Sequence, residues 1–378
     1  MTPLVTIVGA GLGGLTLARV LQRHGVPVVV YERDDSGRAR SQGGQLDLHP
    51  ENGQRAIEIA GLSDGFRSIV HLGGAAARIA DRHGVILADV PDDGSMSNPE
   101  ALRGDIRRLL LDSLADGTVQ WGKKATSVVS VGDAHHEVAF ADGTKVVSDV
   151  LVGADGVWSK VRPLVSDSVP AYSGLSYIDT YLDDVDARHA AIAGLVGDGA
   201  LYALEPGRGF LAHREPGDRI HNHVVVNRPP EWFDDIDFGD SAAARARLLA
   251  EFAGWDGVLT GLISDSDTDP ILRMIYELPD DHRWNHVPGV TLIGDAAHAT
   301  VPGSDGANNA MLDGAELALS IAAHPDDVDT ALAEFEEVMF PRSAAAAATG
   351  HQDVELIFGP GAPHALADLF NAVEPDPR

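Results

Sequence analysis

The chain contains 378 residues, of which 28 are Lys or Arg and 57 are Asp or Glu, so its formal net charge is −29 at pH 7. A protein this acidic repels phosphate backbones and anionic bilayers, and we therefore expect neither a nucleic-acid nor a membrane partner. The absence of cysteine excludes disulfides, thiol nucleophiles, cysteine-ligated zinc, iron–sulfur clusters and flavin attached through a cysteine. No Lys or Arg precedes Arg19 as the basic start of a signal peptide would require, so we expect a cytoplasmic protein.

The N-terminal residues predict a strand, a tight turn, a helix and a second strand in succession. Residues 4–9 (LVTIVG) are a short β-branched run, and residues 9–14 (GAGLGG) are dense in glycine. Residues 15–24 have a helical composition, and residues 26–31 (VPVVVY) read as a second buried strand, which ends at Glu32.

Later segments repeat this alternation and then change character. Apolar residues at helical spacing predict a helix over residues 99–114, and residues 146–153 (VVSDVLVG) predict a strand. Between residues 171 and 272, short alternating segments such as 207–213 and 221–226 indicate an antiparallel sheet.

The C-terminal part returns to the first pattern, with a buried strand before residues 294–298 (GDAAH) and a helix near 310–323. A helical tail follows from residue 329, with a break near residues 360–363. We therefore expect an α/β nucleotide-binding domain in three pieces (1–75, 97–170 and 273–340). A second domain (76–96 and 171–272) is inserted between the pieces, and a helical segment (341–378) ends the chain.

The glycine-dense turn matches the pattern G-x-G-x-x-G between a strand and a helix. There Gly9 permits a tight turn, Gly11 lets a pyrophosphate approach the backbone, and Gly14 lets the helix pack on the strand. Glu32 lies 18 residues beyond Gly14, where a carboxylate binds ribose hydroxyls. This context predicts a dinucleotide site, and the alternative is a glycine-rich turn that serves packing alone.

Two further motifs distinguish FAD from NAD. Residues 153–156 (GADG), followed by Ser159, Val161 and Arg162, resemble the DG motif of aromatic-hydroxylase flavoproteins, and residues 294–298 resemble their second flavin motif. Either aspartate taken alone is equally well a helix cap.

Over nearly its whole length the chain resembles the single-component, FAD-dependent class A monooxygenases (para-hydroxybenzoate hydroxylase-like), and among them the tetracycline-inactivating flavin monooxygenases. The resemblance is densest at residues 31–34 (YERD), 43–49 (GGQLDLH), 98–105 and 294–298. It implies a Rossmann-like FAD-binding domain with an inserted antiparallel-sheet substrate domain and a C-terminal helix, holding FAD non-covalently. The cofactor-binding residues that it implies are Gly9, Gly11, Gly14, Glu32, Arg33, Arg40, Asp47, Arg103, Asp155, Asp295, Gly306, Ala307 and Asn308.

Within that set the resemblance assigns different tasks. Glu32 is expected at the adenosine ribose, Arg33 near the adenosine end, and Asp47, Arg103 and Asp295 at other parts of FAD. Arg40 is expected where the family meets NADPH, which suits a guanidinium that grips phosphate with two hydrogen bonds. The alternative for Arg40 is a solvated arginine on a basic turn.

The loop expected beside the flavin ring departs from the family pattern P-x-x-G-(Q/E)-G-x-N. This chain has Pro302, Gly303, Ser304, Asp305, Gly306, Ala307 and Asn308, which is one residue shorter and places Ser304 where the family has glycine. The departure puts the mobility of the flavin ring, or the fit of the substrate, in question.

His221 and His223 form an H-x-H pair, which on a strand places both imidazoles on one face. A metal pair needs a third ligand, and the sequence identifies none because the acidic neighbours read as solvent-facing. We therefore expect no metal. By the resemblance His221 matches a substrate contact of the tetracycline-inactivating members, whereas the residue types near Asp179 and Ala200 differ from theirs. An ordinary sheet histidine is the alternative.

The resemblance implies that NADPH or NADH reduces FAD, that O2 forms a flavin C4a-hydroperoxide, and that one oxygen atom hydroxylates an aromatic or polyketide-like molecule, tetracyclines included. The single G-x-G-x-x-G is consistent with a reductant that reacts and leaves. We expect a monomer. The alternatives are an FAD-dependent reductase or dehydrogenase and a degenerate ligand-binding module. A flavin halogenase is disfavoured because no W-x-W sequence is present.

Overall fold

The computed structural model describes residues 4–39, 43–95, 97–303 and 305–372. The chain divides into two compact units, each built from three separate segments. Unit 1 falls within Met1–Val70, Ala101–Ala171 and Tyr276–Gly350, and unit 2 within His71–Glu100, Tyr172–Ile275 and His351–Arg378. The expected α/β class is confirmed, with a parallel sheet, antiparallel sheets and a C-terminal helix.

Unit 1 is built on a five-stranded sheet in which every neighbouring pair is parallel. In sheet order the strands are β17 (Val290–Leu292), β11 (Val150–Gly153), β1 (Val5–Val8), β2 (Val28–Tyr31) and β7 (Val119–Gln120). All four residues of β1 and of β11 are buried. Strands covered on both faces read as continuous apolar runs, which is why β-branched residues dominate these segments.

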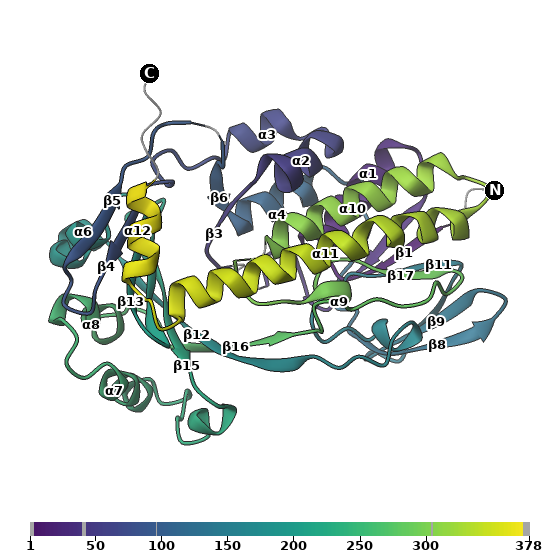
Figure 1. Ribbon diagram of the computed structural model, residues 1–378. Helices are drawn as coiled ribbons and strands as arrows, with labels where there is room; N and C mark the ends of the chain where they lie inside the picture. Colours follow the sequence, from purple (N-terminus) through teal and green to yellow (C-terminus); the bar gives the residue numbers. More distant parts are fainter. Residues whose placement is uncertain (1–3, 40–42, 96, 304, 373–378) are drawn as a thin grey trace. The chain divides into compact units, whose positions relative to one another are not determined.

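Helices cover one face of this sheet, and Figure 1 shows α1, α10 and α11 side by side on it. The helices and helical turns of unit 1 are α1 (Leu12–Arg23), η1 (Pro50–Gln54), α2 (Arg55–Ala60), α3 (Ser63–Arg67), α4 (Arg103–Asp112), η2 (Arg162–Leu164), α9 (Asp295–His298), α10 (Gly306–Ala323) and α11 (Val328–Phe358, of which unit 1 holds the part up to Gly350). Glycines let α1 and α10 approach closely, because a Cβ on Gly13 would lie 2.6 Å from the Ala310 carbonyl oxygen.

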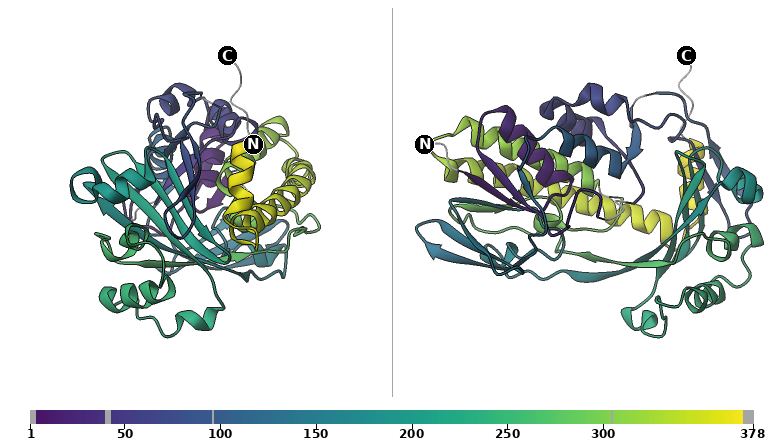
Figure 2. Two further views of the ribbon diagram at one scale, coloured as in Figure 1. Left: turned by 60° about the vertical axis from the view of Figure 1, so that its left-hand side comes forward. Right: turned by 180° about the vertical axis from the view of Figure 1, so that it is seen from behind.

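Two smaller sheets complete unit 1. An antiparallel sheet of β8 (Ala125–Gly132), β9 (His135–Phe140) and β10 (Lys145–Ser148) lies on the side of the parallel sheet opposite to α1 and α10 (Figure 2). It contributes Val138 and Phe140 to the same core. The second is a pair formed by β3 (Gln45–Asp47) and β6 (Glu100–Leu102).

Two expected elements are wrong in detail. The helix expected over residues 99–114 starts only at Arg103, because residues 100–102 are extended and pair with β3. The strand expected over residues 146–153 is two strands, since the chain passes from β10 in one sheet to β11 in another at Asp149. An apolar run carries no mark of a change of sheet, so the sequence could not show this break.

Unit 2 contains a seven-stranded sheet of mainly antiparallel pairs, in which β4 and β13 run parallel. In sheet order the strands are β16 (Ile271–Glu277), β12 (Ala171–Asp183), β15 (Arg219–Asn227), β14 (Arg208–Glu215), β13 (Ala200–Glu205), β4 (Ala77–Ala80) and β5 (Ile86–Val90). The antiparallel character expected for residues 171–272 is therefore observed.

The two faces of this sheet have different covers. One face packs through a core that includes Ile178, Phe210 and Val224 against the helical elements α5 (Val185–Arg188), α6 (Ala190–Val196), η3 (Pro230–Phe233), α7 (Ser241–Glu251) and α8 (Gly257–Ser264). The other face packs a smaller core, with Leu175, Leu204 and Val225, against the end of α11 and α12 (His364–Ala372).

The expected break in the tail lies between α11 and α12, and the expected start of a separate segment at residue 341 falls inside α11. None of the described helices is long and apolar enough to span a bilayer.

Candidate functional site

The carboxyl ends of the parallel strands in unit 1 carry most of the expected cofactor residues. Gly9 follows β1, Glu32 follows β2, Asp155 follows β11 and Asp295 follows β17. In parallel α/β sheets the carboxyl ends of strands form the ligand-binding edge, at the point where neighbouring connections run to opposite sides. The chain order of the sheet places β1 at that point, between β11 and β2.

Of the three glycines of the G-x-G-x-x-G pattern, two are fixed by packing and one faces open space. Gly9 has a φ of +109°, and a Cβ there would lie 2.2 Å from the Ala154 carbonyl oxygen. A Cβ on Gly14 would lie 2.2 Å from the Gly9 carbonyl oxygen, whereas one on Gly11 would meet no atom of the described residues within 4 Å. The helix α1 begins there without a side-chain cap. A bare backbone, open space and a helix N-terminus suit a pyrophosphate, so these residues fit FAD.

Glu32 and Arg107 fix the shape of this loop. The Glu32 carboxylate is buried and accepts hydrogen bonds from the main-chain N–H groups of Ala10 (2.6 Å) and Asp34 (3.0 Å). Arg107 donates through Nε to the Ala10 carbonyl oxygen (3.1 Å) and through a terminal nitrogen to that of Gly37 (2.9 Å). The sequence did not single out Arg107, whose partners are main-chain atoms that no side-chain pattern reveals.

The two motif aspartates differ in their surroundings. The Asp155 carboxylate accepts hydrogen bonds from Ser159 Oγ and the Lys160 N–H, both at 2.6 Å, and burial raises its pKa. Asp295 is exposed, and within the described ranges no residue gives its carboxylate a hydrogen bond or ion pair. Buried Arg162 links the two motifs by donating to the carbonyl oxygens of Ala296 (2.8 Å) and Val157 (2.9 Å). Asp155 therefore holds its own turn, while Asp295 remains available to a ligand.

The loop with the shortened pattern is tied to the segment after β3 by an ion-pair bridge. His49 lies between two carboxylates, with Nδ1 3.0 Å from Asp305 Oδ2 and Nε2 2.8 Å from Asp47 Oδ2. Hydrogen bonds to Asp305 and Asp47 raise the pKa of His49 to about 10, so the imidazole is charged at neutral pH. Asn308 reinforces the tie, because its amide donates to the Asp47 carbonyl oxygen (2.9 Å). Asp47 is thus joined to residues of the loop that is expected beside the flavin ring.

The remaining members of the expected set lie in the same unit. The Arg103 N–H donates to the Gly44 carbonyl oxygen (3.1 Å) where α4 begins, and Gly303 has a φ of +98°. Gly306 and Ala307 open α10, and Arg33 is exposed after β2. Arg40 and Ser304 lie outside the described residues.

A buried charge network holds the second flavin motif, residues 294–298, in place. Asp313, on α10, accepts hydrogen bonds from His298 Nε2 (2.6 Å), the Gly294 N–H (2.9 Å) and Arg342 (2.8 Å). Burial alone would lower the pKa of His298, but the Asp313 carboxylate outweighs it and raises that pKa. The network fixes the loop that carries Asp295, and no local pattern could reveal it because its members are far apart in the chain.

In unit 2 the H-x-H pair has an acidic neighbour. Asp179 on β12 faces His223 across the strand pair, and its Oδ1 lies 2.7 Å from His223 Nδ1 and 3.8 Å from His221 Nε2. Arg273 pairs with the other oxygen of this carboxylate. The expectation that the acidic neighbours are solvent-facing is therefore wrong, because the Asp179 side chain is only 2% exposed.

The titration of these groups follows from burial. Burial lowers the pKa of His221 to about 4, so its imidazole is neutral at pH 7. Although burial alone would raise it, the imidazoles of His221 and His223 and the Arg273 guanidinium hold the pKa of Asp179 below its ordinary value. His221 stacks on Tyr181 with ring centroids 4.2 Å apart, and its Nε2 has no hydrogen-bond partner among the residues that the structure describes.

Among the residues that the structure describes, two clusters bring together enough ligand atoms for a metal ion, Asp179–His221–His223 and His49–Glu51–Asp305. In the first cluster, the Arg273 guanidinium already forms an ion pair with the Asp179 carboxylate that a metal ion would need as a ligand. In the second, His49 already bridges two carboxylates as a cation. A positive side chain beside a ligand opposes a divalent cation, so neither cluster favours a metal.

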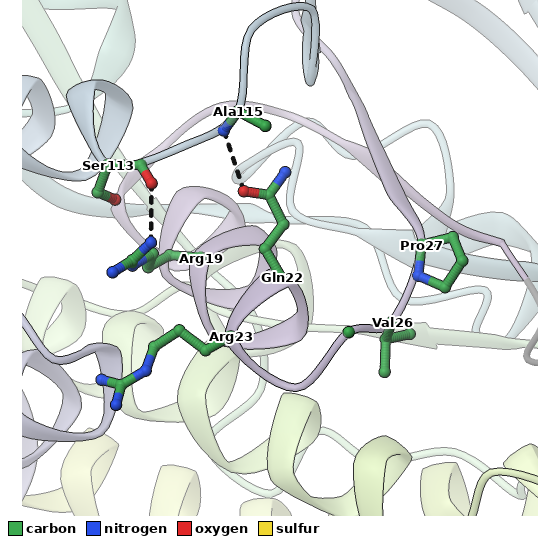
Figure 3. Close-up of a pocket in the computed structure, with 8 residues that line it drawn as sticks. Arg19, Gln22, Arg23, Val26, Pro27, Ser113 and Ala115 are labelled. Atoms are coloured by element: carbon green, nitrogen blue, oxygen red, sulfur yellow. Dashed lines mark hydrogen bonds between the residues drawn. The ribbon is translucent and has the colours of Figure 1, made fainter.

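A cavity of about 510 Å³ lies in unit 1 at the other end of the sheet, beside Pro27 ahead of β2 (Figure 3). There Arg19 donates to the Ser113 carbonyl oxygen (2.9 Å), and Gln22 Oε1 accepts from the Ala115 N–H (3.1 Å). These polar groups serve neighbouring main-chain atoms. The cavity contains none of the expected site residues.

Residues 2–228 match the family model described as "FAD binding domain". The chain is 29% identical to the 3-amino-4-hydroxybenzoate 2-monooxygenase of Streptomyces cremeus over 90% of this chain and 84% of that protein. This similarity spans almost the whole of both sequences.

Solved structures share the fold. Klebsiella pneumoniae HpxO in complex with FAD and uric acid superposes with a TM-score of 0.79 at 22% identity, over 98% of this chain and 92% of that chain. The tetracycline destructase Tet(51) gives a TM-score of 0.74 at 19% identity, over 98% and 95% of the two chains. At these identities the likeness concerns the fold alone.

Proposed function

Since the chain belongs to the FAD-binding-domain family of class A flavin monooxygenases, we propose that it uses NADPH or NADH and O2 to hydroxylate an aromatic or polyketide-like small molecule. The overall reaction consumes one reduced nicotinamide, one proton and one O2 for each substrate. It yields the hydroxylated product, the oxidised nicotinamide and water.

The observation that carries the proposal is the open stretch of backbone at Gly11, together with the exposed carboxylate of Asp295, which pairs with no described residue, at the same edge of the sheet. Hydroxyl-rich and phosphate-rich ligands need this combination of donors and acceptors. When bound, FAD supplies the redox and oxygen-transfer chemistry.

The chain's own residues bind and orient. In this proposal the loop at Gly11 holds the pyrophosphate, Glu32 and Arg33 hold the adenosine end, and Asp295 binds a hydroxyl of the cofactor. Arg103, Asp155 and the segment from Pro302 to Asn308 complete the site.

The bridge between Asp47, His49 and Asp305 is part of the same proposal. It fixes Asp305 relative to His49 and Asp47, so these three residues are preorganised for the flavin ring.

The substrate is assigned to unit 2, with His221 as a contact. Named relatives act on small aromatic rings, among them 3-amino-4-hydroxybenzoate, and this supports an electron-rich aromatic substrate. A tetracycline-type substrate belongs to the same class, although the residue types at Asp179 and Ala200 differ from those expected for it. Arg40 is proposed to meet the nicotinamide cofactor, and the protein is proposed to act as a cytoplasmic monomer.

Turnover under labelled oxygen tests the function. The purified protein, loaded with FAD, is supplied with NADPH or NADH, ¹⁸O2 and a panel of phenols, aminohydroxybenzoates and polyketides, and the products are analysed by mass spectrometry. The proposal predicts one labelled oxygen atom in a product and substrate-dependent consumption of the reduced nicotinamide. Reduction of FAD without labelled product from any member would support a reductase, and failure to bind FAD would support a binding module.

A further inference from the structure

Two side chains of opposite charge hold successive peptide groups of the glycine loop. The N–H of Ala10 donates to the Glu32 carboxylate, with Oε2 2.6 Å from the nitrogen. The carbonyl oxygen of Ala10 belongs to the next peptide group, and it accepts a hydrogen bond from Arg107 Nε at 3.1 Å. Ala10 is therefore fixed by an anion at its nitrogen and by a cation at its oxygen.

The Arg107 side chain is itself closely fixed. Arg107 lies on α4, is only 2% exposed, and its guanidinium lies over the Trp121 ring, 5.6 Å from the ring centroid. Its Nη1 donates to the Gly37 carbonyl oxygen at 2.9 Å. Because a guanidinium is planar, Nε cannot leave the Ala10 oxygen without disturbing the bond to Gly37.

The contact at the Ala10 oxygen determines the direction of the next N–H group. In a planar trans peptide the C=O and the N–H point in opposite directions. The N–H of this peptide group belongs to Gly11, so it points away from Arg107. Gly11 is exposed, a Cβ there would meet no atom of the described residues within 4 Å, and its N–H donates to none of them. This donor therefore faces the open side of the loop.

Without Arg107 the same peptide group could turn over. A flip changes mainly ψ of Ala10 and φ of Gly11, and glycine adopts positive φ about as readily as the φ of −75° that Gly11 has here. The glycine that leaves room for a ligand thus also permits the flipped form. In that form the Ala10 carbonyl oxygen would face the open side, where it would repel the oxygens of a phosphate.

We propose that Arg107 is a positioning residue for FAD, which holds the Ala10–Gly11 peptide group with its N–H toward the pyrophosphate. This inference rests on the proposed function, because it concerns the same cofactor site. A cation at the carbonyl oxygen also polarises the peptide group, since hydrogen bonds in a chain strengthen one another. Arg107 thus acts through the Gly11 donor, both by orienting it and by strengthening it.

The first test is a double-mutant cycle on FAD affinity, measured by fluorescence titration. Arg107→Met keeps most of the length of the side chain but removes its donors, and we expect FAD affinity to fall by about 10-fold. Gly11→Ala blocks the same contact. The double variant should therefore bind FAD within about 2-fold of the weaker single variant, whereas independent losses would multiply.

The second test observes the peptide group itself and needs no ligand. A hydrogen bond to a carbonyl oxygen draws electrons from the nitrogen of that peptide group and moves its ¹⁵N resonance downfield. In NMR spectra of the ¹⁵N-labelled apoprotein, the Gly11 resonance should therefore move upfield in Arg107→Met.

Arg107→Lys keeps the charge without the planar fork, so it should lie between wild type and Arg107→Met in both tests. If Arg107→Met does not fold, Arg107→Lys takes its place in the cycle and in the spectra.

The matched control is Arg19→Met. Arg19 lies on α1 beside the cavity at the other end of the sheet, and it also donates to two main-chain carbonyl oxygens, those of Ala60 (3.2 Å) and Ser113 (2.9 Å). Its loss should lower the melting temperature but leave the Gly11 resonance and the FAD affinity as in wild type.

Unchanged FAD affinity in Arg107→Met, multiplied losses in the double variant, or an unchanged Gly11 resonance would overturn the inference. ¹⁸O incorporation is measured on the same preparations. A protein that meets these expectations but incorporates no oxygen would contradict the proposed function and leave the role of Arg107 standing. An oxygenase in which the losses multiply would do the reverse, and a wild type that binds no FAD would contradict both.

Discussion

The carboxylate of Glu32 holds the glycine loop, with Oε2 2.6 Å from the main-chain nitrogen of Ala10. The sequence predicted Glu32 as a ribose ligand, and the structure adds a second task, since its other oxygen accepts from the Asp34 N–H. Each carboxylate oxygen can accept two hydrogen bonds. One residue can therefore shape the loop and still meet a ribose hydroxyl.

The substitution Glu32→Gln tests the role of Glu32 in FAD binding. A glutamine NH2 group cannot accept the hydrogen bond of one of the two main-chain N–H groups, and it carries no charge. We expect FAD affinity to fall by about 10- to 100-fold, the range for a charge-assisted hydrogen bond. Fluorescence titration of the apoprotein with FAD measures the change, and Glu58→Gln on the exposed surface of α2 is the control. Equal affinities for Glu32→Gln and wild type would remove Glu32 from the cofactor site.

Two glycine substitutions distinguish packing from ligand contact. Gly11→Ala should fold with an unchanged apoprotein melting temperature, because a Cβ there meets nothing within 4 Å and the backbone is extended. Its methyl group should instead exclude the pyrophosphate and weaken FAD binding by about 10-fold or more. Gly9→Ala, with a φ of +109° and a contact of 2.2 Å, should destabilise the apoprotein itself. Unaltered FAD binding by Gly11→Ala would show that the open space does not hold the cofactor.

Asp295→Asn tests the exposed carboxylate. Because no described residue pairs with it, its removal should not change the melting temperature of the apoprotein. FAD affinity should fall by about 10-fold if the carboxylate accepts a hydroxyl of the cofactor. Asp167→Asn, at another exposed position of unit 1, is the matched control and should bind FAD normally. Loss of apoprotein stability in Asp295→Asn would indicate a structural role instead.

The bridge at His49 predicts a pH dependence of stability. Its pKa is raised from 6.5 to about 10 by Asp305 and Asp47, so the folded protein holds a proton that the unfolded chain releases. The stabilisation is fully present below about pH 6.5 and is lost as the pH rises toward 10.

Urea unfolding near pH 6 and near pH 9 should show a decrease in the free energy of unfolding that His49→Gln reduces. An unchanged pH dependence in His49→Gln would mean that other groups cause it.

His221 acts in the opposite sense, since burial lowers its pKa to about 4 and its contribution to stability is lost as the pH falls below about 6.5.

Local patterns were enough to predict the fold class. The run LVTIVG, the glycine turn and Glu32 follow one another within a short part of the chain, and their spacing is what indicates a dinucleotide site. The H-x-H pair was visible for the same reason. Its acidic partner was not, because Asp179 reaches His223 only through the register of β12 on β15, which joins positions 44 residues apart.

Charge pairs formed by tertiary structure were equally hidden. Asp313 meets Arg342 through the packing of α10 against α11, and Asp305 meets His49 across most of the chain length. The start of α4 was misplaced because pairing of residues 100–102 with β3 outweighs their helical spacing.

Under the proposed function, this chain activates oxygen on bound FAD. The most direct measurement mixes the NADPH-reduced, FAD-loaded protein with O2 in a stopped-flow spectrophotometer and records the full spectrum. We predict a transient spectrum, different from those of both oxidised and reduced flavin, before the oxidised spectrum returns, and a faster decay when substrate is present. Return of the oxidised spectrum in a single step, with and without every substrate of the panel, would contradict the proposed monooxygenase function.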